Sequence, residues 1–360
     1  MALTIPALLA ERVAAHGKEI VLRKKHRGIW QAVTWAELGA HVHAVSNALA
    51  GIGFQSGDVA CVLAETTPES VYADIGILEA GGVSGAINPA SEADAVGELL
   101  QQSRCSVLFL QNEEQLDKAL VVRERCPTLR HIVIFDMKGL RDFADPMCQS
   151  LQDFVAHEGH SAAAITPDQP AVLLLPGMRV LTHDDAMHVV EHARSVLQPR
   201  AGDERLALLP MCHALERLGL YLSLDTCAIS NYLESPDTVV ENLQEVQPTL
   251  LGTDVATWQL LYDRATRAAD AATPLQRNLY RWAIASGGAL AKFFVLDAVR
   301  RELGLGRLRH AYTGAVALPP EIERWAAALG ITVQYVNGQT TQGSTGDARY
   351  RALMEEAYSA

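Results

Sequence analysis

The residues 188–192, His-Val-Val-Glu-His, have the spacing of a metal-binding helix. Positions four apart lie on one face of an α-helix, so His188 and His192 are placed to share one zinc ion. The pattern also matches the His-x-x-Glu-His motif of one class of zinc peptidase. A catalytic zinc, an adventitious surface metal site and an ordinary solvent-facing helix all fit this pattern, and we expect the ordinary helix.

Other catalytic motifs are missing from the sequence. It has no Gly-x-Ser-x-Gly turn for a nucleophilic serine and no Gly-x-x-x-x-Gly-Lys-Ser/Thr loop for nucleoside phosphates. The nearest approach to a dinucleotide-binding fingerprint, Gly304-Leu305-Gly306, lacks the third glycine and follows an expected helix rather than a strand.

The charge of the chain argues against two classes of partner. Its 360 residues include 42 acidic and 30 basic ones, a formal net charge of −12. Nucleic acids and anionic membranes are bound by clustered Lys and Arg. The one basic cluster, residues 23–27, is short and precedes Gly28, which is typical of a solvated hairpin turn. We therefore expect no nucleic-acid partner.

The cysteines and the apolar runs bear on the cellular compartment. The six cysteines include no Cys-x-x-Cys pair, which indicates buried free thiols in a reducing environment. No apolar run reaches the roughly 18 residues that span a bilayer. The N-terminus lacks the positively charged start of a secretory signal. We expect a cytoplasmic protein without a transmembrane segment.

Short apolar strands alternate with helices along the first half of the chain. Thr34 and Glu37 form a capping box, which predicts a helix from there to about residues 51–53. Further helices are expected at 69–80, 91–101 and 113–125. Strands are expected at 59–63, 83–87, 107–110 and 131–135.

The same rhythm continues after a polar stretch at residues 136–166. Strands are expected at 172–175, 206–209, 228–232, 249–251, 308–312 and 332–335. Continuous apolar strands spaced by helices are typical of a parallel sheet covered on both faces. We predict an α/β fold with two parallel-sheet subdomains, residues 1–165 and 166–346, and a C-terminal helix over 347–360.

Many segments, in order along the chain, resemble the long-chain acyl-CoA synthetases of the AMP-forming, adenylate-forming superfamily. The similar segments are 28–37, 57–60, 72–76, 80–83, 114–118, 129–133, 209–217, 245–249, 306–309 and 318–321. Each one is short, but they are colinear to about Gly343. The resemblance implies the N-terminal-domain fold of that superfamily.

The resemblance also implies a two-step reaction. In that family a carboxylate attacks the α-phosphate of ATP to give an acyl-adenylate, and the thiol of coenzyme A then displaces AMP. ATP, magnesium and coenzyme A are therefore the cofactors expected of an active member, and a fatty acyl group is the expected ligand.

The loop that holds the triphosphate in that family is shortened here. The family has a Ser/Thr/Gly-rich loop ending in Pro-Lys-Gly, followed by Leu-Thr-His. Leu181-Thr182-His183 is present, but only residues 176–180 separate it from the strand at 172–175. We interpret this segment as a tight strand-to-helix connection with an exposed Arg179. Contact of Arg179 with a phosphate is the alternative.

A second nucleotide motif of the family is altered. Its Tyr-Gly-Leu/Met-Thr-Glu corresponds to residues 337–341, which keep Gly338 and Thr340. Asn337 lacks the stacking face of the aromatic residue, and Thr341 removes a carboxylate that helps to hold magnesium.

The adenine-side stretch and the end of the chain also depart from the family pattern. Gly314 and Ala315 lie in the changed adenine-side stretch, and with Thr182 they are expected remnants of a nucleotide site. The family continues with a barrel segment and a C-terminal domain whose lysine promotes adenylation, and the residues given after Gly343 resemble neither.

His213 and Glu216 match the family's Leu-Pro-x-x-His-x-x-Glu segment, in which the histidine lies beside the acyl carboxylate. They are candidates for a residual acyl pocket. The alternative is a strand-end histidine that is hydrogen-bonded to a neighbour.

Three functional hypotheses follow from the resemblance. One is a degenerate synthetase that binds an acyl group or regulates an intact synthetase paralogue. The second is an active AMP-dependent ligase that tolerates these losses or borrows a C-terminal domain from another chain, and the third is a decayed or engineered fragment without dedicated activity. We favour the first. Because the missing parts normally cover apolar surface, we expect a homodimer or a paralogue as partner.

Overall fold

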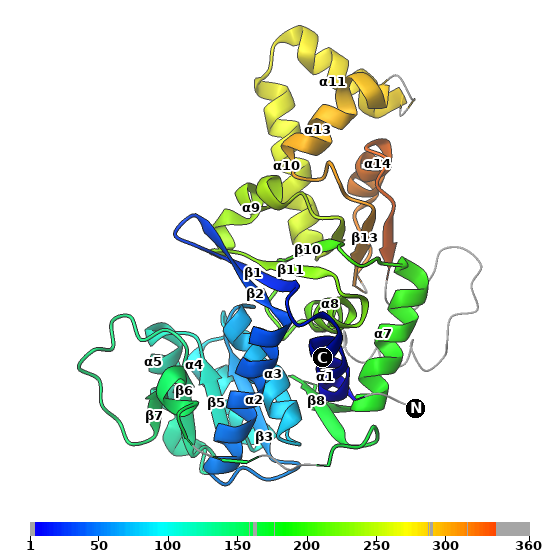
Figure 1. The fold of residues 1–360 in the computed structure, drawn as a ribbon. Helices are drawn as coiled ribbons and strands as arrows, with labels where there is room; N and C mark the ends of the chain where they lie inside the picture. The colour runs from blue at the N-terminus through cyan, green and yellow to red at the C-terminus, as the bar shows by residue number, and fades with distance from the viewer. Residues whose placement is uncertain are drawn as a thin grey trace.

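Two seven-stranded sheets, A and B, form the framework of the protein (Figure 1). The structure is a computed structural model, and it describes residues 4–157, 159–160, 164–175, 177–286, 288, 291–314 and 316–335. In spatial order, sheet A contains β14 (Val333–Tyr335), β13 (His310–Thr313), β12 (Leu250–Gly252), β10 (Glu204–Ala207), β11 (Ile229–Tyr232), β1 (Ile20–His26) and β2 (Ile29–Thr34). Sheet B contains β7 (Cys148–Ser150), β6 (His131–Ile134), β5 (Val107–Leu110), β3 (Val59–Leu63), β4 (Val83–Ile87), β8 (Pro170–Leu174) and β9 (Arg179–Thr182).

Helices cover the sheets in three groups. One group shares the central core with a face of each sheet: α1 (Ile5–His16), α2 (Trp35–Gly51), α3 (Pro68–Glu79), α7 (His183–Leu197) and α8 (Ala214–Thr226). The second packs on the other face of sheet B: α4 (Ala93–Ser103), α5 (Glu113–Val122) and the turn η1 (Arg123–Arg125). The third group shares a core with the other face of sheet A: α9 (Val239–Val246), α10 (Val255–Ala271), α11 (Pro274–Ser286), η3 (Lys292–Leu296), α13 (Asp297–Glu302) and α14 (Pro320–Ala328).

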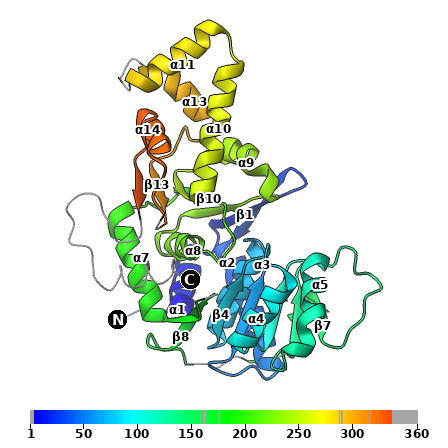
Figure 2. The same ribbon diagram turned by 180° about the vertical axis from the view of Figure 1, so that it is seen from behind.

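Figure 2 shows α10, α11 and α13 on the far side of sheet A from sheet B. The short helix α6 (Leu151–Phe154) follows β7, and the turn η2 (Pro236–Thr238) precedes α9. Among the described residues, no helix combines the length and the apolar character needed to cross a bilayer.

The predicted α/β fold is confirmed, and several strand positions agree to the residue. The strands expected at 59–63, 83–87 and 107–110 have these bounds in the structure. The Thr34–Glu37 capping box is present, and α2 follows it. The strands are parallel to their neighbours, except that β2 runs antiparallel to β1 and β9 runs antiparallel to β8.

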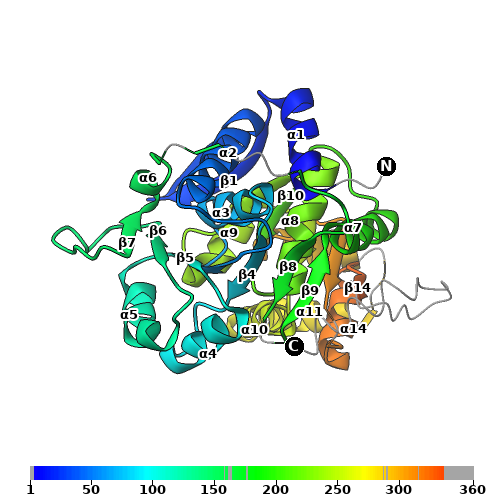
Figure 3. The same ribbon diagram turned by 90° about the horizontal axis from the view of Figure 1, so that it is seen from below.

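The two sheets do not follow the expected division at residue 165. β1 and β2, from the start of the chain, lie in sheet A, where β1 pairs with β11. β8 and β9, from beyond residue 165, lie in sheet B beside β4, as Figure 3 shows. The two sheets are therefore not built from contiguous halves of the chain, as we had predicted. Strand pairing joins residues that are far apart in the sequence, and local patterns do not reveal it. The helix predicted over 347–360 lies outside the described residues.

The basic run at 23–27 does form a hairpin turn, at which Arg27 and Gly28 have φ angles of 50° and 77°. It is not the solvated cluster that we expected. The side chains of Arg23, Lys24 and Lys25 each pair with a glutamate of another element.

Candidate functional site

A cavity of about 700 Å³ lies between the two sheets, where several strands end. Asn88 follows β4, Leu175 follows β8, Leu209 comes two residues after β10, and Gly314 follows β13, and all four line the cavity. Ligands of open α/β sheets bind beyond the carboxyl ends of the strands, so this position is the expected one for a ligand site.

The cavity wall is mostly apolar, and two helices begin at it. The larger apolar side chains of the wall include Ile87, Leu99, Leu175, Leu209, Leu215 and Val255. His213 is the N-cap residue of α8, and Asp254 caps α10 by accepting a hydrogen bond from the amide of Thr257. Because α8 presents its first amides here and His213 leaves them uncapped, this end of the cavity is suited to an anionic group.

His213, a candidate acyl-pocket residue, lines the cavity. Its imidazole is exposed at the cavity and makes no hydrogen bond within the part of the chain that the structure describes. The neighbouring Cys212 also lines the cavity, and burial raises the pKa of its thiol to about 11. Cys212 is therefore protonated at neutral pH and is a poor nucleophile.

Glu216 does not line the cavity. One turn along α8 from His213, its carboxylate accepts a hydrogen bond of 2.6 Å from Arg205 Nη1. Both side chains are buried, and burial alone would lower the pKa of Arg205, but the charge and hydrogen bond of Glu216, together with Tyr232 and Tyr312, raise that pKa. Glu216 is thus half of a buried ion pair, and the structure separates it from His213.

The segment at the position of the family's phosphate loop is a β-hairpin, not the strand-to-helix connection that we expected. Leu174 of β8 is opposite Arg179 of β9, which leaves residues 175–178, four in all, to join the strands. Met178 adopts a left-handed φ of 52° in this connection, and the side chain of Arg179 is half-buried.

Thr182 caps α7. Its hydroxyl oxygen accepts from the amide of Asp185 at 3.0 Å and donates to the Asp185 carboxylate at 2.8 Å. The next residue, His183, is buried, and its Nδ1 accepts from the amide of Ile5. Burial lowers the pKa of His183 to about 4, so the ring is neutral near pH 7. Neither residue is free to hold a phosphate group.

The remaining predicted nucleotide-site residues are placed only in part. Gly314 lines the cavity beside the buried Thr313. Ala315, Gly338 and Thr340 lie outside the described residues, and their role in a nucleotide site stays a prediction.

The structure gives no support to a zinc site on α7. Among the residues that it describes, no three His, Cys, Asp or Glu side chains are grouped as a metal ion requires. His188 and His192 lie on α7, which packs against α8 as an ordinary partly buried helix.

Sequence reasoning missed several polar cavity residues, among them Asn88 and Asp254. Asn88 directly follows the strand 83–87, which was predicted correctly, so the rule that ligands bind at carboxyl ends of strands was a usable signal. Asp254 comes two residues after β12 ends at Gly252, and we had expected that strand to end at residue 251.

Comparisons with known proteins agree with this architecture. The model of the family "AMP-binding enzyme" matches residues 9–345. A long-chain-fatty-acid–CoA ligase of Rattus norvegicus, ACSBG2, is 23% identical over 94% of this chain and 56% of its own length. The ACSBG1 ligase of the same organism is 21% identical over 95% of this chain and 52% of its length. The chain thus spans about half the length of these relatives.

Solved structures share the fold. The adenylation domain of a carboxylate reductase from Mycobacterium chelonae has a TM-score of 0.77 at 18% identity, over 95% of this chain and 58% of that one. The N-terminal domain of FACL13 from Mycobacterium tuberculosis has a TM-score of 0.69 at 16% identity, over 92% and 75% of the two chains. Because the family model covers almost the whole sequence, the chain belongs to the AMP-binding enzyme family.

Proposed function

We propose that this protein is an acyl-CoA-synthetase-like protein that binds a fatty acyl group and does not form an acyl-adenylate. The observation that carries the proposal is the four-residue connection between β8 and β9 beside an open, apolar cavity. An open apolar cavity favours an acyl ligand, and a connection of this length disfavours a triphosphate.

A triphosphate does not fit the residues at the hairpin. Its charges require several backbone amides and cationic side chains in a fixed geometry. Four connecting residues supply few amides. The hydroxyl of Thr182 is already bonded to Asp185, and His183 is neutral and buried.

The cavity suits an acyl ligand. Its volume of about 700 Å³ lies within the range of about 300–1,000 Å³ that is usual for small-molecule sites. The apolar wall favours burial of an alkyl chain, and the start of α8 with His213 favours a carboxylate at one end.

Isothermal titration calorimetry tests both halves of the proposal. Dodecanoate is expected to bind and Mg·ATP is not, whereas an active ligase of the family, used as a control, binds both. His213→Ala should weaken dodecanoate binding but leave binding of the neutral dodecanol unchanged, since the substitution removes a contact to the carboxylate only. Failure of dodecanoate to bind would overturn the acyl-binding half.

A pyrophosphate-release assay addresses the reaction itself. With ATP, magnesium, dodecanoate and coenzyme A, the protein should release no pyrophosphate above background. Release would support the active ligase instead. The assay repeated with an intact synthetase of the same family tests the regulatory form of the proposal, in which this protein changes the rate of its partner.

A further inference from the structure

A second cavity, of about 600 Å³, lies on another side of the sheet interface. Its lining includes residues that follow β3, β5, β6, β10 and β11, and the β1–β2 hairpin closes one side. Among the described residues, Leu209 is the one that lines both cavities. Its carbonyl accepts a hydrogen bond of 2.7 Å from the Thr66 hydroxyl, which holds the wall between them.

Acidic groups outnumber basic ones in this second cavity. Glu65, Glu69, Asp136 and Glu234 line it, and its lysines are Lys24 and Lys25, the other potential cation being His26. With the histidine neutral, four carboxylates and two ammonium groups leave the lining with a charge of −2.

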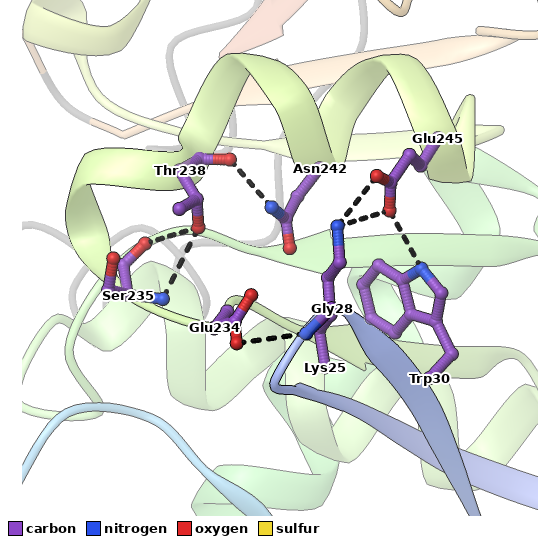
Figure 4. A network of polar contacts seen from close by, with 8 residues as sticks. All are labelled: Lys25, Gly28, Trp30, Glu234, Ser235, Thr238, Asn242 and Glu245. Carbon is purple, nitrogen blue, oxygen red and sulfur yellow. Dashed lines mark hydrogen bonds and ion pairs between the residues drawn. The ribbon is translucent and has the colours of Figure 1, made fainter.

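Both lysines are already neutralised. Lys24 Nζ lies 3.0 Å from a carboxylate oxygen of Glu69. Figure 4 shows Lys25 directed at Glu245, with both carboxylate oxygens at 2.6 Å, and the indole of Trp30 donates to the same carboxylate at 3.0 Å. Glu245 does not line the cavity. The ammonium group of Lys25 is therefore paired with a carboxylate outside the acidic lining.

The other three carboxylates have no basic partner within the described part of the chain. Glu234 accepts from the amide of Gly28 at 3.1 Å (Figure 4), and Asp136 accepts from the amide of Lys138 at 2.9 Å. Glu65 is half-buried, and no described residue forms a hydrogen bond or an ion pair with its carboxylate. Burial, with a smaller effect from Glu114, raises the pKa of Glu65.

We propose that this second cavity is a binding site for a small organic cation, an amidinium, guanidinium or primary ammonium group on a short apolar body. A planar amidinium pairs with a carboxylate through two parallel hydrogen bonds, and Glu65 is the carboxylate that lacks any partner. Phe135, Leu233 and Pro236 supply the apolar part of the wall. The cavity is large enough for such a molecule. This site is independent of acyl binding in the first cavity.

Calorimetry with benzamidine and its neutral isostere benzamide tests the assignment on the whole chain. Benzamidine is expected to bind at one saturable site and benzamide is not. Glu65→Gln should weaken benzamidine binding at least about tenfold, because a charge-assisted pair is lost. Glu124→Gln is the matched control, since it removes one exposed glutamate outside the lining and should leave the affinity unchanged.

Three results would overturn the proposal: no saturable benzamidine binding, equal binding of benzamide, or equal affinity in the Glu65→Gln and Glu124→Gln proteins. Thermal unfolding of each variant checks that it is folded. If Glu65→Gln does not fold, Asp136→Asn decides, because this exposed lining carboxylate has no basic partner either. It should then weaken benzamidine binding, and an unchanged affinity counts against the site.

Discussion

The ion pair between Arg217 of α8 and Asp74 of α3 joins the two halves of the fold, and we predict that breaking it is costly. Arg217 Nη2 lies 3.0 Å from Asp74 Oδ1, and Arg217 Nη1 donates to the carbonyl of Ser84 in β4 at 3.1 Å. The Asp74 carboxylate also accepts from the hydroxyls of Ser84 and Tyr221. The two charged side chains are 5% and 0% exposed.

The magnitude follows from this burial. Arg217→Met keeps most of the side-chain volume but leaves the Asp74 charge without its cation, which costs about 3–5 kcal/mol for a buried pair. Total unfolding free energies are about 5–15 kcal/mol, so the loss is a large fraction of the stability. Adding Asp74→Asn removes the stranded charge, and the double variant should recover about half of the loss.

Urea denaturation followed by far-ultraviolet circular dichroism measures these free energies for the parent, both single variants and the double variant. Arg123→Met is the control, because its pair with Asp145 is more exposed, at 37% and 16%, and should cost about 1 kcal/mol or less. A cost of Arg217→Met as small as that of the control would refute the reasoning. So would a double variant less stable than Arg217→Met alone.

Three further predictions concern α7 and sheet A. Since the folded-state pKa of His183 is about 4 against about 6.5 in the unfolded chain, protonation favours unfolding, and ~3 kcal/mol is lost as the pH falls from 6.5 to 4. Urea titrations should show a smaller loss over that window for His183→Gln, and equal pH slopes would contradict the assignment. Thr182→Ala should cost ~1 kcal/mol by chemical denaturation, while Thr182→Ser should cost little, because serine can cap α7 in the same way. Gly252→Ala places a methyl group against the buried ring of Tyr312 and should lower stability by ~1–3 kcal/mol in the same assay, and an unchanged midpoint would argue against that contact.

Local chemistry made much of the fold predictable. The strand 59–63 is a continuous apolar run between a glycine turn and a helix cap, and its five residues form β3. The Thr34–Glu37 cap depends on two side chains three residues apart, so short-range pattern suffices to find it. In contrast, β1 enters sheet A by pairing Leu22 with Ser230, and nothing near Leu22 specifies a partner so far along the chain.

The candidate site was predictable only where a residue's neighbours in sequence decide its role. His213 lies at the cavity because it begins α8, and its position in the family motif indicated this. Glu216 belongs to the same family motif, but its carboxylate forms an ion pair with Arg205 of β10. Lys25, expected to be solvated, is likewise held by Glu245, 220 residues away. In both cases a charged side chain on another element sets the role of the residue, and the local sequence pattern does not reveal that pairing.

The buried charged side chains at the start of α8 help to explain how the fold is held together although the β8–β9 connection is short. Three residues near the start of α8 point to different places: His213 to the cavity, Glu216 to Arg205 in sheet A, and Arg217 to Asp74 and β4 on the side of sheet B. α8 is therefore bound to sheet A by a buried ion pair and to sheet B by the hydrogen bond from Arg217 to the Ser84 carbonyl, and neither contact includes a residue of the β8–β9 connection. Since the sheets are held by α8, the cavity between them should not depend on the length of that connection. Lengthening the hairpin should accordingly leave dodecanoate binding intact, even where it creates room for a phosphate.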